Sequence, residues 1–155
     1  MSERSDRRRV MRMSVFRILL VEDNEGDVEI VKSALDDWRD GCRLTVTYDG
    51  AEALDCLRNG VCAESRPDLI LLDINMPRMD GKECLRNLKH DEKFRMIPVS
   101  MLTSSQAPSD ILECYRSHAS CYVVKPFEAR EFIKVVRQLV TFWSDVARPP
   151  SRAVW

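Results

Sequence analysis

Carboxylate, hydroxyl and ammonium side chains stand directly after four short apolar runs of this sequence. Glu22 and Asp23 follow the first run, and Asp73, Thr103 and Lys125 each follow a later one. Carboxylates of this kind bind divalent cations through oxygen, and a carboxylate is also a nucleophile that forms covalent phosphoryl intermediates. A hydroxyl and an ammonium can hold the phosphoryl oxygens. These residue types therefore indicate phosphoryl transfer to an aspartate.

The three carboxylates repel one another if the fold brings them together. At an effective dielectric constant of about 20, two like charges about 4 Å apart cost about 4 kcal/mol before screening. The cluster therefore favours a divalent cation, and Mg²⁺ suits oxygen ligands, keeps several waters and accepts phosphate oxygens. Positioning and charge neutralisation supply most of the catalysis in phosphoryl transfer, and Lys125 adds a positive charge to this set.

Apolar runs suited to strands alternate along the chain with amphipathic helical patterns. Such alternation predicts an α/β fold in which parallel strands are joined by right-handed crossovers, with helices on both faces of the sheet. In open sheets of this kind, chemistry gathers at the carboxyl ends of the strands. The expected strands are Arg17–Val21, Arg43–Tyr48, Leu69–Leu72, Pro98–Leu102 and Cys121–Val124, and the last helix is expected over Glu128–Val146.

Local signals place the helices between these strands. Asp49 with Glu52, and Asp80 with Glu83, have the spacing of a helix-capping box. Gly41 ends the first predicted helix, which begins after Asn24. The spacing of apolar residues predicts two buried helix stripes, Leu54 with Leu57 and Val61, and Ile111 with Leu112 and Tyr115.

Bulk composition excludes several classes of protein. The 155 residues carry a net charge of −1, which favours neither nucleic acid nor a membrane as partner. The 6 cysteines form no CxxC pair and only 2 histidines are present, so we expect no zinc site and reduced thiols that are buried as small hydrophobes. No apolar run approaches the roughly 20 residues of a membrane span. We therefore expect a cytoplasmic protein.

The order Glu22-Asp23, Asp73, Thr103 and Lys125-Pro126 resembles that of the two-component response-regulator receiver family. The resemblance covers about residues 15–146, between a basic extension at 1–14, expected to be disordered, and a tail at 147–155. It implies a flavodoxin-like (βα)5 fold with a five-stranded parallel sheet in the order 2-1-3-4-5. A receiver accepts phosphate from a histidine kinase and catalyses only its own phosphorylation and dephosphorylation, so it is not counted as an enzyme.

The resemblance also implies a role for each matching residue. Asp73 is the phosphoacceptor and Lys125 contacts the phosphate. Asp23 binds Mg²⁺ directly, Glu22 acts largely through water, and the backbone carbonyl of Asn75 supplies a further ligand.

Two further residues correspond to the family's switch pair. Thr103 is the switch hydroxyl and Tyr122, three residues before the lysine, is the switch aromatic. The family also implies a cis peptide bond between Lys125 and Pro126, which a fold readily imposes because cis is disfavoured by only about 0.5–1 kcal/mol at proline.

Softer marks resemble the small stand-alone regulators paired with phytochrome-type histidine kinases. These marks are the runs Val21–Val28 and Arg66–Asp73 and the late pair Phe142-Trp143. That subgroup often forms homodimers through its last strand and helix. The last helix is more apolar than one core-facing stripe requires, which favours an association face. We predict that this face comprises Ile133, Val136, Val140 and Trp143; the alternative is a more deeply buried helix.

Other functions compete with direct signalling by a phosphorylated receiver. The chain could pass its phosphate to a histidine phosphotransfer protein, or act as a constitutive dimeric scaffold. A haloacid-dehalogenase-like phosphatase would need a second acid two residues after the nucleophile, where this chain has Asn75. Direct DNA binding is not expected, because the residues after the last helix are too few for a helix-turn-helix module.

Overall fold

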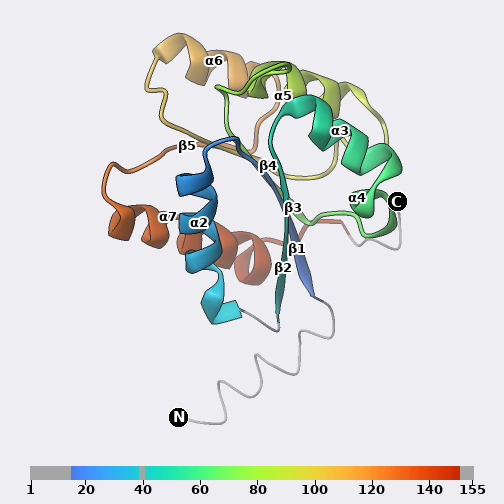
Figure 1. Cartoon of the computed structure of the whole chain (residues 1–155). Coiled ribbons are helices and arrows are strands. Elements are labelled where there is room, and N and C mark those ends of the chain that lie inside the picture. The colour runs from blue at the N-terminus through green and yellow to red at the C-terminus, as the bar shows by residue number, and fades with distance from the viewer. Residues whose placement is uncertain (1–14, 39–40, 151–155) are drawn as a thin grey trace.

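A five-stranded parallel sheet with helices on both faces forms the protein (Figure 1). The computed structural model describes residues 15–38 and 41–150. The strand order is β2-β1-β3-β4-β5, which confirms the predicted flavodoxin-like architecture. The strands are β1 (Phe16–Val21), β2 (Cys42–Thr47), β3 (Leu69–Leu72), β4 (Val99–Thr103) and β5 (Cys121–Val124).

Two groups of helices cover the sheet. Helices α2 and α7 lie together on one face, and α3, α4, α5 and α6 lie on the other (Figure 1). Short helical turns extend two of them, a 3-10 turn η1 (Asp36–Trp38) after α2 and a π-helical turn η2 (Phe142–Val146) after α7. The α-helices are α2 (Glu25–Ala34), α3 (Gly50–Asn59), α4 (Val61–Glu64), α5 (Gly81–His90), α6 (Pro108–Arg116) and α7 (Ala129–Thr141).

The described residues form six α-helices where the sequence predicted five, because Gly60 divides the second one. Gly60 is extended and ends α3, and the short helix α4 begins at the next residue. The predicted stripe is correct for Leu54 and Leu57, which are buried, and wrong for Val61, which is 65% exposed. A glycine has high conformational freedom and readily breaks a helix.

Strand β3 lies at the centre of the sheet, as its four consecutive apolar residues predicted. All four are fully buried, which is possible because helices cover both of its faces. Side chains alternate between the two cores: Ile70 and Leu72 pack with α3 and α5, and Leu69 and Leu71 pack with α2 and α7. This rigid centre fixes the position of Asp73 at its carboxyl end.

Helix α6 buries a different residue from those predicted. Cys114 is fully buried, whereas Leu112 and Tyr115 are about half exposed, at 50% and 48%. The hydroxyl of Tyr115 accepts a hydrogen bond from the backbone N–H of Tyr122 in β5 at 3.1 Å. Tyr115 therefore lies along the edge strand of the sheet, and the small cysteine provides the contact with the core.

The predicted association face on α7 requires correction. Val136 and Val140 are 0% and 1% exposed and pack with Phe132 against the sheet, so they are not available to a partner. Ile133 and Trp143 are half-buried and also pack against this core. The helix is apolar on two sides, and spacing alone did not distinguish the stripe that faces the sheet from the one beside it.

The predicted helix caps are present. The Oδ1 atom of Asp49 accepts the N–H of Glu52 at 2.8 Å, and that of Asp80 accepts the N–H of Glu83 at 2.9 Å. The six cysteines are free thiols, of which three are buried as predicted and three are only partly buried: Cys42, Cys56 and Cys121. No helix within residues 15–38 and 41–150 is long and apolar enough to span a membrane.

The bond between Lys125 and Pro126 is trans, in contrast to the cis bond that the family resemblance implied. The small intrinsic difference between the two isomers at proline allows either. The predicted extension at 1–14 and residues 151–155 of the predicted tail lie outside the described residues.

Gly81, the first residue of α5, meets the backbone of the loop after β3. A Cβ atom added there would lie 1.9 Å from the carbonyl oxygen of Asp73, which cannot move without displacing that loop. We expect Gly81→Ala to lower the free energy of unfolding by about 3 kcal/mol, as severe overpacking does. The measurement is urea unfolding followed by circular dichroism.

Gly26→Ala is the matched control, because the nearest atom to its added Cβ is the end of the Asn24 side chain at 3.2 Å. It should change the free energy of unfolding by less than about 1 kcal/mol. Equal effects of the two substitutions would contradict the close approach of α5 to Asp73.

Candidate functional site

Three carboxylates meet at the carboxyl edge of the sheet, as the sequence predicted. Glu22 and Asp23 follow β1, and Asp73 follows β3, which pairs directly with β1. One ligand oxygen from each residue lies within 4.8 Å of the others. Glu22 and Asp73 are buried, whereas Asp23 is exposed. The cluster is therefore a small acidic pocket with one side open to solvent.

The ammonium of Lys125 closes the buried side of this pocket. Its Nζ atom donates to Glu22 at 2.6 Å, to Asp27 at 2.8 Å and to Asp73 at 3.3 Å. The lysine side chain is only 6% exposed. Lys125 reaches the site because β5 ends beside β4, and the backbone N–H of Lys125 continues this pairing by donating to the carbonyl of Thr103.

Burial and charge act in opposite directions on these groups. Burial raises the pKa of Glu22, the hydrogen bond from Lys125 lowers it and the charge of Asp73 raises it again, so that the pKa lies at about 7. Burial lowers the pKa of Lys125, but its hydrogen bonds with Asp27 and Glu22 outweigh this and raise the pKa above its usual value. The lysine is therefore a permanent positive charge, and the protonation of Glu22 changes near neutral pH.

The two oxygens of Asp73 have different surroundings. Its Oδ1 atom accepts the backbone N–H of Ile74 at 2.8 Å, and its Oδ2 atom faces Lys125. The hydrogen bond to Ile74 fixes the plane of the carboxylate. Asn75, predicted to contribute its backbone carbonyl to a metal site, lies exposed in the loop two residues beyond Asp73; its role stays a prediction.

Thr103 and Tyr122 both contact the loop that follows β4. Thr103 is fully buried, and its Oγ1 atom accepts the N–H of Ser105 at 3.4 Å. The hydroxyl of Tyr122 donates to the backbone carbonyl of Ser105 at 2.8 Å. Ser105 in turn donates its hydroxyl to Asp110 of α6 at 2.5 Å. One loop thus links the hydroxyl near the acidic pocket, the aromatic residue on the edge strand and helix α6.

Sequence reasoning did not assign a role to Asp27, although its spacing carries a signal. Asp27 stands four residues after Asp23, and its N–H is held by the side chain of Asn24 at the start of α2. A residue in the first turn of a helix after a strand end lies close to that strand end. The helix start thus brings a fourth carboxylate to the site, where it is the third to contact the lysine.

Comparison with known proteins decides the family. The model of the response regulator receiver domain matches residues 18–137. The chain belongs to the response regulator receiver family. That match includes most of β1, the whole of the other four strands and every carboxylate of the site, so the convergence of these residues is the arrangement of a receiver domain.

Individual relatives resemble most of the chain. "Response regulator Rcp1" of Synechocystis is 34% identical over 136 residues, which cover 86% of this chain and 92% of Rcp1. The "Probable methanogenesis regulatory protein FilR2" of Methanothrix harundinacea is also 34% identical, over 89% of this chain and 90% of FilR2.

Solved structures of two such proteins are similar to this fold. The phosphorylated cyanobacterial phytochrome response regulator RcpA has a TM-score of 0.85 and 36% identity, covering 89% of this chain and all of RcpA. The Mn²⁺-bound form of Rcp1 has a TM-score of 0.81 and 33% identity, covering 88% of this chain and 99% of that one.

The donor set of the acidic pocket fits a divalent cation. All three side chains present carboxylate oxygens, which hard cations prefer, and the described residues place no histidine or cysteine in the cluster. The exposed carboxylate of Asp23 leaves the cluster open on one side, where bound water or a phosphate oxygen can complete the coordination. The residues therefore fit a cation that retains part of its hydration shell.

Substitution of Lys125 tests how strongly the stability of the protein depends on the ammonium that pairs with the buried carboxylates. We expect Lys125→Met to lower the free energy of unfolding by about 3 kcal/mol in metal-free protein, because it leaves Glu22 and Asp73 buried without a cation. Since Glu22 has a raised pKa of about 7, the difference from wild type should be largest above pH 7 and shrink towards pH 5, where Glu22 holds a proton.

Lys134→Met provides the matched control, because Lys134 pairs with Glu131 on the exposed surface of α7. Its effect on urea unfolding should stay within about 0.5 kcal/mol at every pH. A Lys125→Met effect that is small, or independent of pH, would contradict the electrostatic role of Lys125.

Proposed function

We propose that this protein is a single-domain response regulator that accepts a phosphoryl group on Asp73 from a histidine kinase. The observation that carries the proposal is the position of the Asp73 carboxylate, which lies both in the acidic cluster and 3.3 Å from the ammonium of Lys125. A carboxylate oxygen attacks phosphorus, the P–N bond of the donor phosphohistidine breaks, and the kinase imidazole leaves. The product is an acyl phosphate on Asp73.

Mg²⁺ is the proposed cofactor, held by Asp23, Asp73 and the backbone carbonyl of Asn75, with Glu22 acting through water. The all-oxygen donor set supports this assignment, as does the Mn²⁺-bound form of the similar protein Rcp1. When bound, the ion neutralises charge on the phosphoryl oxygens. Lys125 contributes its own fixed positive charge on the buried side of the pocket. The protein thus catalyses only its own phosphorylation and dephosphorylation.

The loop after β4 is the proposed route from the phosphate to the surface. Thr103 donates its hydroxyl to a phosphoryl oxygen and moves towards the site, which loosens its contact with the N–H of Ser105. Tyr122 holds the same loop through the carbonyl of Ser105. The loop continues into α6, so the shift changes the surface formed by α6, β5 and α7. The phosphoryl charge on Asp73 thereby shifts the equilibrium between two conformations of this loop and surface.

A phytochrome-type histidine kinase is the proposed phosphodonor, acting on this regulator in the cytoplasm. Support comes from the structural similarity to RcpA, which is described as a phytochrome response regulator and covers 89% of this chain at 36% identity. The run Val21–Val28 and the pair Phe142-Trp143 support the same subgroup. FilR2 has the same identity to this chain as Rcp1 and is described as a probable methanogenesis regulatory protein. Phosphotransfer assays with a phytochrome-type kinase and with a histidine kinase of another type therefore discriminate between inputs.

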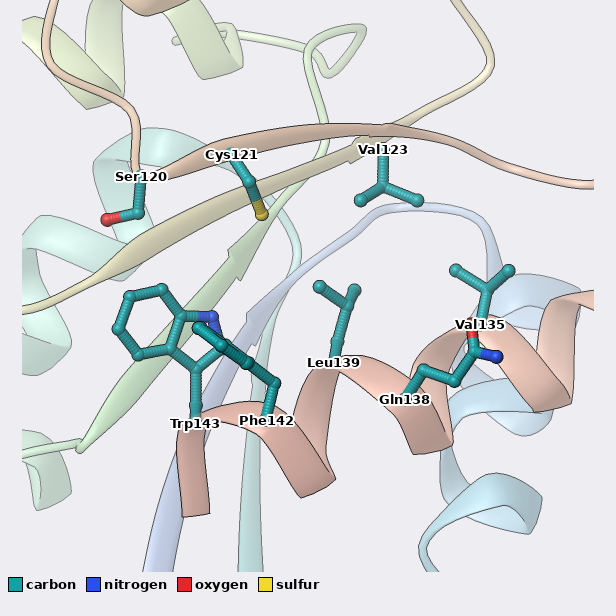
Figure 2. A pocket seen from close by; sticks show the side chains of 8 residues that line it. All are labelled: Ser120, Cys121, Val123, Val135, Gln138, Leu139, Phe142 and Trp143. Carbon is teal, nitrogen blue, oxygen red and sulfur yellow. The ribbon is translucent and has the colours of Figure 1, made fainter. Parts of the chain in front are cut away.

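A homodimer through β5 and α7 is the proposed assembly. Figure 2 shows Val123 of β5 facing Val135 and Leu139 of α7 across a groove, with Phe142 and Trp143 at one end. The groove has a volume of about 590 Å³ and a largely apolar lining. Strand β5 is an edge strand, and Phe142 is 48% exposed. An apolar groove beside an exposed aromatic residue favours the binding of a second copy of the chain, which would bury both the groove and the aromatic ring.

The phosphoacceptor can be tested with a small phosphodonor. Acetyl phosphate with Mg²⁺ should add one phosphoryl group to the wild-type protein, detected by intact mass spectrometry, and none to Asp73→Asn or in the presence of EDTA. Asp55→Asn, which changes an exposed carboxylate on α3, should behave as wild type. Absence of phosphorylation of the wild type would contradict the proposal and favour a constitutive scaffold.

The dimer can be tested by size-exclusion chromatography with light scattering, with and without Mg²⁺ and beryllofluoride. We expect Phe142→Asp to raise the dimer dissociation constant at least about tenfold, because it places a charge in an apolar contact. Val61→Asp is the matched control, an exposed valine on α4 at the opposite face of the sheet. A monomeric wild type under both conditions would contradict the dimer.

A further inference from the structure

Asp27 contacts the lysine of the site without belonging to the metal-binding carboxylates. Its Oδ2 atom lies 2.8 Å from the Nζ atom of Lys125, and its side chain is 24% exposed. The three carboxylates that cluster as candidate metal ligands are Glu22, Asp23 and Asp73, and Asp27 is not among them. It is therefore an anion whose removal leaves both the nucleophile and the cation ligands in place.

The three donors of the ammonium are all engaged. A lysine ammonium has three N–H donors and no acceptor. In this structure they go to Glu22, Asp27 and Asp73, and the contact with Asp73 is the longest of the three at 3.3 Å. A phosphoryl oxygen that arrives at Asp73 must therefore compete for the N–H donors of Lys125 with Asp27 and Glu22, which both lie closer to the ammonium than Asp73 does.

The local backbone keeps Asp27 in this position. The side chain of Asn24 caps α2 by accepting the N–H of Asp27 at 3.0 Å, and the N–H of Val28 donates to the carbonyl of Asn24. The adjacent Val28 is buried in the core between α2 and the sheet. The carboxylate of Asp27 is thus fixed beside Lys125 by the start of the helix.

We propose that Asp27 is a positioning residue that restrains Lys125 and lowers the affinity of the unphosphorylated site for a phosphoryl group. The inference rests on the proposed phosphorylation of Asp73 and adds an element that tunes it. Asp27 takes one of the three ammonium donors and places a further negative charge close to an incoming dianion. Both effects oppose capture of the phosphoryl group and favour the unphosphorylated state.

Asp27→Asn removes this charge and keeps the shape of the side chain and the backbone cap. We expect it to bind beryllofluoride, in the presence of Mg²⁺, about fivefold more tightly than wild type, which corresponds to about 1 kcal/mol. Fluorine NMR titration measures the affinity, and initial rates of phosphorylation by acetyl phosphate should rise in the same direction. Asp27→Glu restores the charge beside the lysine and should return the affinity towards that of wild type.

Glu25→Gln is the matched control, because it removes the same charge from an exposed position in the same helical turn. It should leave beryllofluoride affinity within about twofold of wild type, since an exposed charge without contact to Lys125 is screened by solvent and salt. An equal gain in affinity for Glu25→Gln would overturn the proposal in favour of general charge repulsion.

The outcomes separate this inference from the proposed function. If wild type fails to bind beryllofluoride, or binds it as well as Asp73→Asn does, the proposed function fails. If wild type binds it through Asp73 and Asp27→Asn binds with equal or lower affinity, only the role of Asp27 is overturned. A purely structural role for Asp27 would lower affinity and thermal stability together, the reverse of the expected gain.

Discussion

One buried ammonium organises the functional edge of this protein. Lys125 lies among three carboxylates, two of which are almost fully buried, and without it these anions would face each other in a region of low dielectric. Buried charges are stable only when they are paired and hydrogen-bonded. Burial is the main cause of the raised pKa of Glu22, at about 7, and the charge of Asp73 adds to it. Three carboxylates around one ammonium also leave this site with an excess of negative charge. This excess negative charge is the physical reason that the site fits a divalent cation.

The sheet brings these charges together from residues far apart in the chain. Glu22 and Lys125 are separated by 103 positions, and their contact exists because the carboxyl ends of parallel strands meet at the same edge. The central strand β3 has no exposed face, so Asp73 stands at the end of a strand that is packed on both sides. By contrast, the loop after β4 and helix α6 carry partly exposed groups. A buried acceptor next to a partly exposed loop suits a site whose phosphorylation must change the surface of the protein.

The half-exposed residues of α6 lie on one side of the edge strand β5, and the groove between β5 and α7 lies on the other side. Leu112 and Tyr115 lie exposed on α6, and the hydroxyl of Tyr115 contacts the backbone of Tyr122. Tyr122 connects this region inward to Ser105, and Ser105 contacts Thr103. Direct hydrogen bonds therefore connect Thr103, at the end of β4, with Tyr115 on the exposed surface of α6. This continuity gives the proposed signal a physical path that does not require the sheet to deform.

Much of the fold and the site could be predicted from the sequence, because each depends on local patterns. Strand β3 and the caps at Asp49 and Asp80 were predicted at the correct residues, and the carboxylates after β1 and β3 were expected at one edge of the sheet. Periodicity was less reliable for helices that are apolar on two sides. It assigned Val136 and Val140 to an outer face although the sheet buries both, and it placed Tyr115 inside although Tyr115 lies along the edge strand.

The sequence by itself determined which residues can do chemistry, since residue type and position after a strand are local properties. Only the tertiary structure decided which partners share the ammonium of Lys125, and it added Asp27 to that set. It also decided which stripe of α7 packs against the sheet. Both outcomes depend on the angle and distance at which one element packs on another, and that geometry results from the whole core and from no single segment of the chain.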